Sequence, residues 1–284
     1  MSSVHIVDDV PELDELSDAG GPVLIHALDG FLDAGNAGAL AVAHLLSHDA
    51  GRVVASFDVD SFYDYRARRP PMTFVEDHYQ DYAAPRLVVR LVRDSLGTPF
   101  LLLHGPEPDT RWEGFASAVR EVIEHFGVRL TVGLGSVPMA VPHTRPVMLT
   151  NHGTSPDLLI QENVWAGTIR IPSSAQPQLD YPAAAATMLE SVEVVTGLEW
   201  DLTALEAAGA ERLAEIGAQI ADSAEVADVV AGLEQQYDSF HRPESAEGAG
   251  SPLPLAEERD LPTGEELGAE FERFLAGLDR RDDE

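Results

Sequence analysis

The stretch PFLLLHGPEPDTRWEGFASAVREVIEHF, residues 99–126, indicates the fold of this chain. It begins with an apolar run of strand length, turns through two prolines, and continues with apolar residues at helical spacing. A buried strand that leads directly into an amphipathic helix is the repeating unit of an α/β protein. Within this unit we expect Asp109 or Thr110 to cap the helix and Trp112 to open its core-facing stripe.

The same alternation of strand and helix extends over the first 197 residues. Apolar runs predict strands at 23–28, 53–59, 87–92, 100–104, 129–135, 146–152 and 165–172. Helical spacing predicts helices at 34–48, 111–126 and 181–197. Strands this apolar suit a sheet covered by helices on both faces, so we predict an α/β fold, a three-layer αβα sandwich. Because some strands follow one another without a helix, we expect a mixed sheet.

The chain changes character after the sandwich domain, which we place at 1–197. A helical extension is predicted at 198–240, with a break near 222–223. The stretch at 241–262 is rich in Pro, Gly, Ser and Glu and predicts a flexible acidic linker. Apolar residues at helical spacing then predict a short C-terminal helix and acidic tail at 263–284.

Composition excludes several classes of function. The formal net charge is -31, which repels phosphate backbones and anionic membranes, so we expect no nucleic-acid partner and no membrane partner. No apolar run reaches the roughly 18–20 residues that span a bilayer. The chain contains no Cys, which excludes disulfides and thiol chemistry. We therefore expect a cytoplasmic protein.

Polar residues near predicted strand ends and helix starts are candidate pocket residues, because open α/β sheets bind ligands there. These are Gly30, Asp33, Asn36, His104, Arg111, Arg145 and His152. In the stretch LDGFLDAGNAGAL, the residues Asp33 and Asn36 would equally well cap the following helix. The chain shows no nucleotide fingerprint, no G-x-S-x-G frame and no metal-ligand spacing, so we assign no catalytic residue, no metal and no cofactor.

The stretch FYDYRARRP, residues 62–70, is the candidate interface. It concentrates Arg and Tyr, namely Tyr63, Tyr65, Arg66, Arg68 and Arg69, within a strongly acidic chain. Arg and Tyr are enriched at protein interfaces, although salt bridges within the chain or a small anionic ligand would use them as well. We expect a homo-oligomer, with a trimer favoured.

Five separated stretches, DGFLDAGNAG, YDYRARRP, HGPEPDTRWEGF, GLGSVPMAVPHTRP and LEQQYD, resemble the proteasome assembly chaperone 2 family in its actinobacterial branch. The resemblance extends over about residues 20–240 in one collinear order. It implies a nucleoside-phosphorylase-like αβα sandwich, a helical C-terminal region and protein partners related to the proteasome. Archaeal relatives dock through a hydrophobic–Tyr–X ending; this chain ends RRDDE, so we do not expect that docking mode. The family carries over no catalytic residue.

Two functional hypotheses follow. The first is a non-catalytic assembly or adaptor protein that self-associates and binds other proteins. The second is a phosphorylase- or hydrolase-like enzyme, or a small-molecule binder, that holds an anionic substrate at the C-terminal ends of the strands. In the second, Arg145 would hold the anion and a histidine would act as general acid or base. A pocket that gathers the candidate residues favours the second hypothesis, and their scatter favours the first.

Overall fold

A computed structural model describes residues 3–240 except 31–32, 140, 160–179 and 222–223. All of these described residues lie in one compact unit, Met1–His241. None of the described helices is long and apolar enough to cross a membrane.

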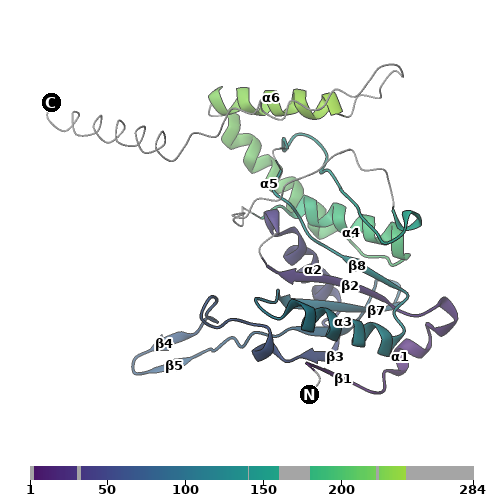
Figure 1. Cartoon of the computed structure of the whole chain (residues 1–284). Helices are drawn as coiled ribbons and strands as arrows, with labels where there is room; N and C mark the ends of the chain where they lie inside the picture. The colour runs from purple at the N-terminus through teal and green to yellow at the C-terminus, as the bar shows by residue number, and fades with distance from the viewer. Residues whose placement is uncertain (1–2, 31–32, 140, 160–179, 222–223, 241–284) are drawn as a thin grey trace, which may run out of the picture. The chain divides into compact units, whose positions relative to one another are not determined.

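A six-stranded mixed sheet forms the centre of this unit, as the sequence predicts (Figure 1). Its strands are β1 (Val4–Ile6), β2 (Val23–Asp29), β3 (Arg52–Phe57), β6 (Val88–Arg93), β7 (Pro99–Pro106) and β8 (Leu130–Gly133). The spatial order is β1-β3-β6-β7-β2-β8. Strand β2 pairs in parallel with β7 and β8, whereas the β1–β3, β3–β6 and β6–β7 pairs are antiparallel.

The two faces of the sheet bury separate apolar cores. Alternate side chains of a strand point to opposite faces, and β7 shows this clearly. Leu101 and Leu103 join the core that includes Phe115 of helix α3, whereas Phe100 and Leu102 join the core that includes Leu45 of α2 and Leu189 of α4. We call these the α3 face and the α2 face. Burial on both faces explains why β7 is an unbroken apolar run in the sequence.

Helices cover both faces and so complete the predicted three-layer sandwich (Figure 1). The α-helices are α1 (Pro11–Asp14), α2 (Ala37–His48), α3 (Trp112–Phe126), α4 (Pro182–Thr196), α5 (Thr203–Ala221) and α6 (Ala224–Phe240). Short 3₁₀ turns are η1 (Ser17–Ala19), η2 (Ala34–Asn36), η3 (Val59–Ser61) and η4 (Pro156–Leu158). Helices α1 and α3 pack on the α3 face, and α2, α4 and the start of α5 on the α2 face. The region after 198 is helical, as predicted, and its described helices are separated at the predicted break.

A β-hairpin that the sequence analysis missed projects away from the main sheet (Figure 1). Strands β4 (Thr73–Val75) and β5 (His78–Gln80) form a separate two-stranded antiparallel sheet. Each strand has only three residues, and the stretch lacks the long apolar run that marks the central strands. Its signal was therefore too short to separate from a loop.

Two of the predicted strands, at 146–152 and 165–172, are not among the described strands. The stretch at 146–152 has no regular secondary structure, so that prediction was wrong. The nearby Pro142 and Pro146 have no backbone N–H, so they cannot donate the hydrogen bonds that pair one strand with another. The strand predicted at 165–172 lies outside the described residues.

The corner before α3 corrects two expectations. Arg111, in the left-handed conformation with φ 57°, precedes the helix, and no side chain caps it. The Asp109 carboxylate instead accepts hydrogen bonds from the Asp64 N–H (2.7 Å) and from Arg68. Trp112 is 48 % exposed and is therefore not part of the core. Phe62, which is fully buried, packs edge-on against Phe115 (ring centroids 5.8 Å apart), and the exposed Trp112 ring contacts Phe115 edge-on as well (6.1 Å).

Three histidines inside the fold have a lowered pKa. Burial lowers the pKa of His26 on β2 and of His44 on α2, and the neighbouring His48 lowers that of His44 further. Burial and then the charge of Arg90 lower the pKa of His104 on β7. Each of these histidines therefore favours its neutral form in the folded protein more than in the unfolded chain.

We expect truncation of Trp112 to cost far less stability than truncation of a buried aromatic residue. Trp112→Ala should reduce the free energy of unfolding by about 1 kcal/mol or less, because the ring is half-exposed. Phe115→Ala, the matched control on the same helix, should cost roughly 3–5 kcal/mol. Urea denaturation followed by circular dichroism measures both, and equal losses would contradict the assignment of Trp112 to the surface.

Stability should fall as the pH drops below about 6.5, the pKa of a histidine in an unfolded chain. There the unfolded state binds protons that the three buried histidines in the folded state resist, and each contributes a slope of up to about 1.4 kcal/mol per pH unit. Unfolding curves between pH 7.5 and 5.5 test this before most carboxylates titrate. Replacing His26, His44 or His104 with Gln should flatten the curve, and an unchanged slope in all three variants would contradict this source of the pH dependence.

Candidate functional site at the strand ends

The connections of the sheet place a topological switch point between β2 and β7, the position where α/β proteins bind ligands. Strands β2 and β7 are parallel neighbours, yet α2 follows β2 on one face and α3 follows β7 on the other. Chains that leave adjacent strands in opposite directions open a gap at the C-terminal ends of those strands. A group of residues that we call the strand-end cluster fills this region: Asp29, Gly30, Asp33, Arg68, Glu107, Asp109 and Ser136.

Glu107 occupies the space directly above the end of β2. A Cβ atom on Gly30 would lie 1.9 Å from Oε2 and 2.9 Å from Cβ of Glu107, so any other residue at this position would displace the Glu107 side chain. The backbone N–H of Glu107 donates to the carbonyl oxygen of Asp29 over 3.0 Å and extends the pairing of β2 and β7 by one more bond. The glycine that the sequence suggested as a ligand cradle thus makes room for a side chain of the protein itself.

The Arg68 side chain bridges the C-terminal ends of β2 and β7. Its Nη1 donates to the carbonyl oxygen of Asp29 (3.3 Å) and its Nη2 to that of Glu107, so one guanidinium joins the ends of both strands. Nη2 also lies 2.9 Å from Oδ2 of Asp109, and the guanidinium carbon lies 4.8 Å from the centre of the Tyr63 ring. Four partners therefore hold this side chain inside the fold.

The other members of the candidate interface differ in their exposure. Tyr63 packs edge-on against Tyr65, with ring centroids 4.9 Å apart. The Tyr65 hydroxyl donates to Asp60 over 2.8 Å, and this bond raises the pKa of Tyr65 to about 12. The side chains of Arg66 and Arg69 are exposed. The Arg- and Tyr-rich loop thus combines one internal clamp with residues that can contact a partner.

The Asp33 carboxylate accepts hydrogen bonds from backbone N–H groups in the first turn of helix α2. Its two carboxylate oxygens accept hydrogen bonds from the backbone N–H groups of Gly38 (2.7 Å) and Ala39 (2.9 Å). Ser136, just after β8, donates its hydroxyl to the same carboxylate over 2.8 Å. A ligand anion at this helix would have to displace Asp33, because both draw on the same N–H groups. Asn36 does not cap; its side-chain amide donates to Asp180 over 2.6 Å.

The strand-end cluster contains more acids than bases. Burial raises the pKa of Asp29, and the charge of Asp33 raises it further, while Arg68 lowers it. The cluster has one guanidinium, that of Arg68, and four acidic side chains: Asp29, Asp33, Glu107 and Asp109. An anionic substrate would meet repulsion here, since like charges this close disfavour one another.

The remaining candidate pocket residues lie elsewhere. His104 points to the α2 face, where its Nε2 accepts a hydrogen bond from Nε of Arg90 over 3.1 Å. Arg111 is exposed at the start of α3, with its guanidinium 5.9 Å from the centre of the Phe62 ring. His152 is exposed in a loop. The structure brings Gly30 and Asp33 into one cluster, with Asn36 in the adjoining turn, and it separates the others from them.

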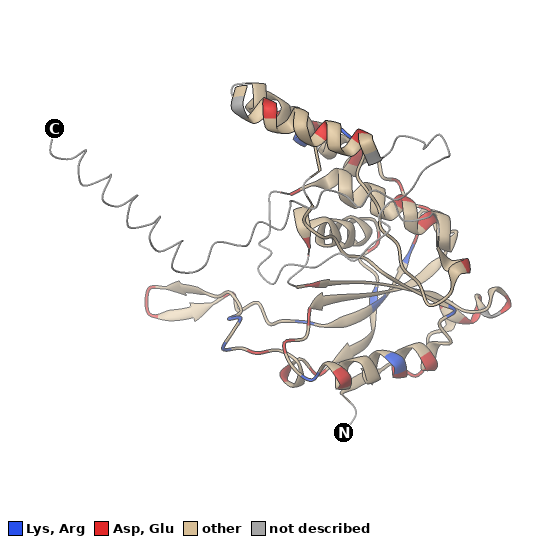
Figure 2. Cartoon of the chain, turned by 45° about the horizontal axis from the view of Figure 1, so that its top comes forward, with Lys and Arg blue, Asp and Glu red and all other residues tan. Residues whose placement is uncertain are grey.

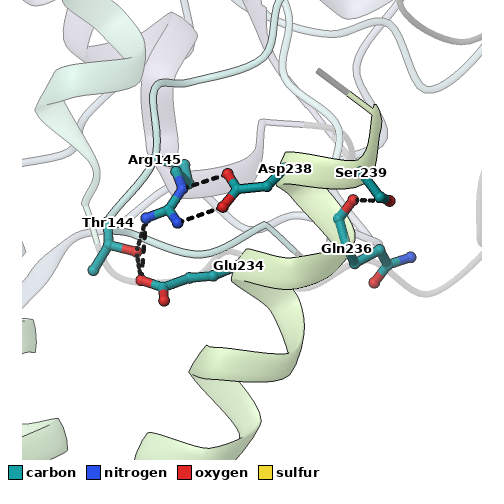
Figure 3. Close-up of polar contacts among 6 residues, drawn as sticks. All are labelled: Thr144, Arg145, Glu234, Gln236, Asp238 and Ser239. Carbon is teal, nitrogen blue, oxygen red and sulfur yellow. Dashed lines mark hydrogen bonds and ion pairs between the residues drawn. The ribbon is translucent and has the colours of Figure 1, made fainter. Parts of the chain in front are cut away.

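Arg145 fastens helix α6 to the loop at 143–146 (Figure 3). Its Nε and Nη2 donate to the two carboxylate oxygens of Asp238, each over 2.7 Å, and Nη1 lies 3.3 Å from Glu234. The bonds to Asp238 raise the pKa of the guanidinium. The Tyr237 hydroxyl adds a bond to the carbonyl oxygen of Pro146 over 3.1 Å. Arg145 therefore serves as an anchor between two distant parts of the chain.

Sequence reasoning missed Arg68, Glu107 and Ser136 as members of the strand-end cluster. Glu107 stands in the quoted strand–turn–helix stretch, and the rule that parallel strands end at one edge would have placed it beside Gly30. No sequence signal places Arg68 there, because 39 positions separate it from Glu107. Within the described residues, no three His, Asp or Glu side chains gather as a metal ion would require.

Removal of the Arg68 clamp should destabilise the fold. Arg68→Ala should reduce the free energy of unfolding by roughly 1–2 kcal/mol, because two strand-end carbonyls and Asp109 lose a charged donor that solvent only partly replaces. Arg66→Ala and Arg69→Ala, exposed neighbours in the same loop, should stay within about 0.5 kcal/mol of the wild type. If all three variants unfold at the same urea concentration, Arg68 is not a clamp.

Comparisons with known proteins show to which family this chain belongs. The family model described as the PAC2 family matches residues 27–179. A Mycobacterium tuberculosis protein of unknown function is 45% identical, with 84% of this chain and 90% of that chain covered and a TM-score of 0.75. A Corynebacterium glutamicum protein of unknown function is 35% identical, with 84% and 98% covered and a TM-score of 0.76.

More distant structures share the same architecture. A second M. tuberculosis protein, described as a proteasome-assembly chaperone homologue, is 27% identical, with 73% of this chain and 99% of that chain covered and a TM-score of 0.62. A comparison with curated proteins found no relative. The match to the family model and the identity to these solved structures agree with the motifs found in the sequence, and the chain belongs to the PAC2 family.

Proposed function

We propose that this chain is a non-catalytic assembly or adaptor protein that forms a homo-oligomer and binds other proteins. The family supports this proposal, since one relative is described as a proteasome-assembly chaperone homologue. The strand-end cluster supports it as well, because Glu107, Arg68 and Asp33 occupy the positions that a substrate would take in an α/β enzyme. A proteasome-related partner and a cytoplasmic location are part of this proposal.

The observation that carries the proposal is the β4–β5 hairpin. Phe74 and Tyr79 lie directly opposite each other in the ladder, with ring centroids 5.0 Å apart, and are 59% and 69% exposed. Met72 and Tyr82 flank them and are about half-exposed. A two-stranded ribbon is marginal in water unless another layer covers it. Clustered aromatic residues on an exposed element are typical of protein interfaces.

We propose that a second copy of this chain covers the hairpin. The exposed Tyr65, Arg66 and Arg69 precede the hairpin in the sequence and add a polar rim of the kind that surrounds an apolar interface centre. Such a rim also complements a partner of the same acidic composition, because two guanidinium groups meet a surface with a net charge of -31. A closed ring of copies would use each hairpin once, and we propose a trimer as that ring.

Loss of the exposed aromatic pair should dissociate the oligomer. Phe74→Ser combined with Tyr79→Ser should shift the mass from a multiple of the chain towards the 30.6 kDa of one chain. Light scattering after size exclusion at micromolar concentration measures this change. Leu96→Ser combined with Val194→Ser, which alters apolar residues of similar exposure elsewhere, should leave the mass unchanged. A wild-type protein that elutes as one chain would refute self-association.

The adaptor role has a separate test. Wild-type protein should capture proteasome subunits or their assembly factors from native cytosol, and mass spectrometry identifies them. The double hairpin variant shows whether the oligomer is required for this capture. Turnover of a substrate by wild-type protein, abolished by a change in the strand-end cluster, would instead support the enzyme hypothesis.

A further inference from the structure

An apolar groove lies between helices α5 and α6 and the loop at 143–144. Its volume is about 340 Å³. Its lining includes Gly217, Ile220 and Ala221 of α5 and Ala227, Val230 and Ala231 of α6. The glycine and the alanines carry no side chain beyond Cβ, so the two helices leave a hollow where larger side chains would otherwise interdigitate.

The apolar residues of these two helices are incompletely covered by the described chain. No residue of α5 from 210 to 221 is buried, and Tyr237 is the one buried residue among the described side chains of α6. Ile220 and Val230, which line the groove, are half-buried. Val229 of α6 is 59% exposed. Apolar surface that its own chain covers so little is typical of a site that another chain covers.

The loop end of the groove is held in one shape (Figure 3). Arg145 donates to both carboxylate oxygens of Asp238 over 2.7 Å each and lies 3.3 Å from Glu234. The Thr144 hydroxyl donates to the same Glu234 carboxylate, and both of these residues line the groove. The spacing between the loop and α6 is therefore set before a partner binds, which reduces the entropy that binding costs.

The β4–β5 hairpin presents the complementary shape. The rings of Phe74 and Tyr79 lie 5.0 Å apart on an exposed two-stranded ribbon. A ring of copies is built from head-to-tail contacts, so each copy must carry two different surfaces that fit one another. The hairpin provides one of these surfaces, and an apolar hollow is the shape required of the other.

A second depression in the described structure does not suit aromatic rings. It has a volume of about 370 Å³, and Asp8, Asp9 and Asp14 are among the residues that line it. Rings placed there would remove carboxylates from water without replacing their hydrogen bonds, which costs free energy. In the α5–α6 groove the rings would instead displace water from apolar side chains, which is favourable. Apolarity therefore selects the α5–α6 groove.

Charge favours one orientation of the contact. Acidic side chains are numerous along the described helices (Figure 2), and Glu215 of α5 and Asp228 of α6 are exposed. The exposed Arg66 and Arg69, in the loop that leads into the hairpin, complement these acids, whereas the acidic turn at 76–77 does not. Charges of this kind fix orientation more than affinity. The hairpin should therefore bind with its base over the acidic helices and its turn directed away from them.

From these observations we infer that the Phe74–Tyr79 pair of one copy binds in the α5–α6 groove of a second copy. This inference rests on the proposed self-association and identifies the surface that receives the hairpin. Each copy then provides one hairpin and one groove, so the contacts can close into a ring. The contact covers the exposed rings and the half-covered apolar residues of α5 and α6 together.

Filling the groove tests the inference without altering the hairpin. A Cβ atom at Gly217 would lie 4.0 Å from Nε2 of His143, its nearest neighbour among the described residues, so Gly217→Leu has room to fold. Leucine also favours a helix more than glycine does. The leucine side chain should block the groove and shift the mass, measured by light scattering after size exclusion, towards the 30.6 kDa of one chain.

The matched control places the same residue outside the groove. A Cβ atom at Gly232 of α6 would meet no described atom within 4 Å, so Gly232→Leu should keep the mass of the wild type. Circular dichroism checks that both variants fold; Ala231→Leu, which fills the same groove from α6, replaces Gly217→Leu if that variant does not. An oligomeric wild type with an unchanged mass for the groove variant overturns this inference alone. Equal dissociation of the Gly232 variant overturns it as well, and a wild type that elutes as one chain overturns the proposed self-association too.

A mixture of two variants tests the direction of the contact. Phe74→Ser combined with Tyr79→Ser leaves the groove intact, and Gly217→Leu leaves the hairpin intact. Each variant alone should be a single chain, whereas their equimolar mixture should contain a species of about twice 30.6 kDa, because one intact hairpin meets one intact groove. A contact between two hairpins would give no such species. A mixture that stays at the mass of one chain therefore overturns the inference.

Discussion

The parallel pairing of β2 with β7 is the constraint on which the rest of this structure depends. Six register positions join the two strands, from Leu24 opposite Leu101 to Asp29 opposite Pro106. Ile25, Leu101 and Leu102 are fully buried, so both faces of this pair must be covered. The helices that follow the two strands take opposite faces, and this choice creates the three layers as well as the crevice at the strand ends.

At the point where β2 and β7 end, side chains of the protein itself satisfy the strand ends and the start of α2. Glu107 lies over Gly30, Arg68 bonds to both strand ends, and Asp33 takes the N–H groups at the start of α2. Each of these side chains satisfies backbone groups that a ligand would otherwise satisfy. Within the described residues these side chains hold the strand ends together, and the exposed aromatic pair Phe74 and Tyr79 lies on the β4–β5 hairpin.

Charge explains why the few arginines matter in this protein. The chain has 49 acidic residues against 18 basic ones, and Arg145 pairs with two carboxylates on α6. Exposed pairs of this kind contribute little stability singly, so their value lies in fixing which segments meet. Arg145 joins α6 to a loop about 90 positions earlier, and Arg68 joins the loop after η3 to the strand ends. Arg90 joins β6 to His104 on β7 and to the carbonyl oxygen of Ala50 in the turn before β3.

The sequence by itself determined the layers, the mixed sheet and the helical C-terminal region, because long apolar runs and helical spacing are local properties of the chain. It left open whether Asp33 or Asn36 serves the start of α2, and the structure shows the Asp33 carboxylate accepting from the N–H groups of Gly38 and Ala39. Only the tertiary structure decided that Phe62 is buried while Trp112 is exposed, that Arg68 reaches the strand ends, and that His104 pairs with Arg90. These contacts join residues far apart in the chain, and no local pattern encodes which distant side chain will fill a given space once the layers pack.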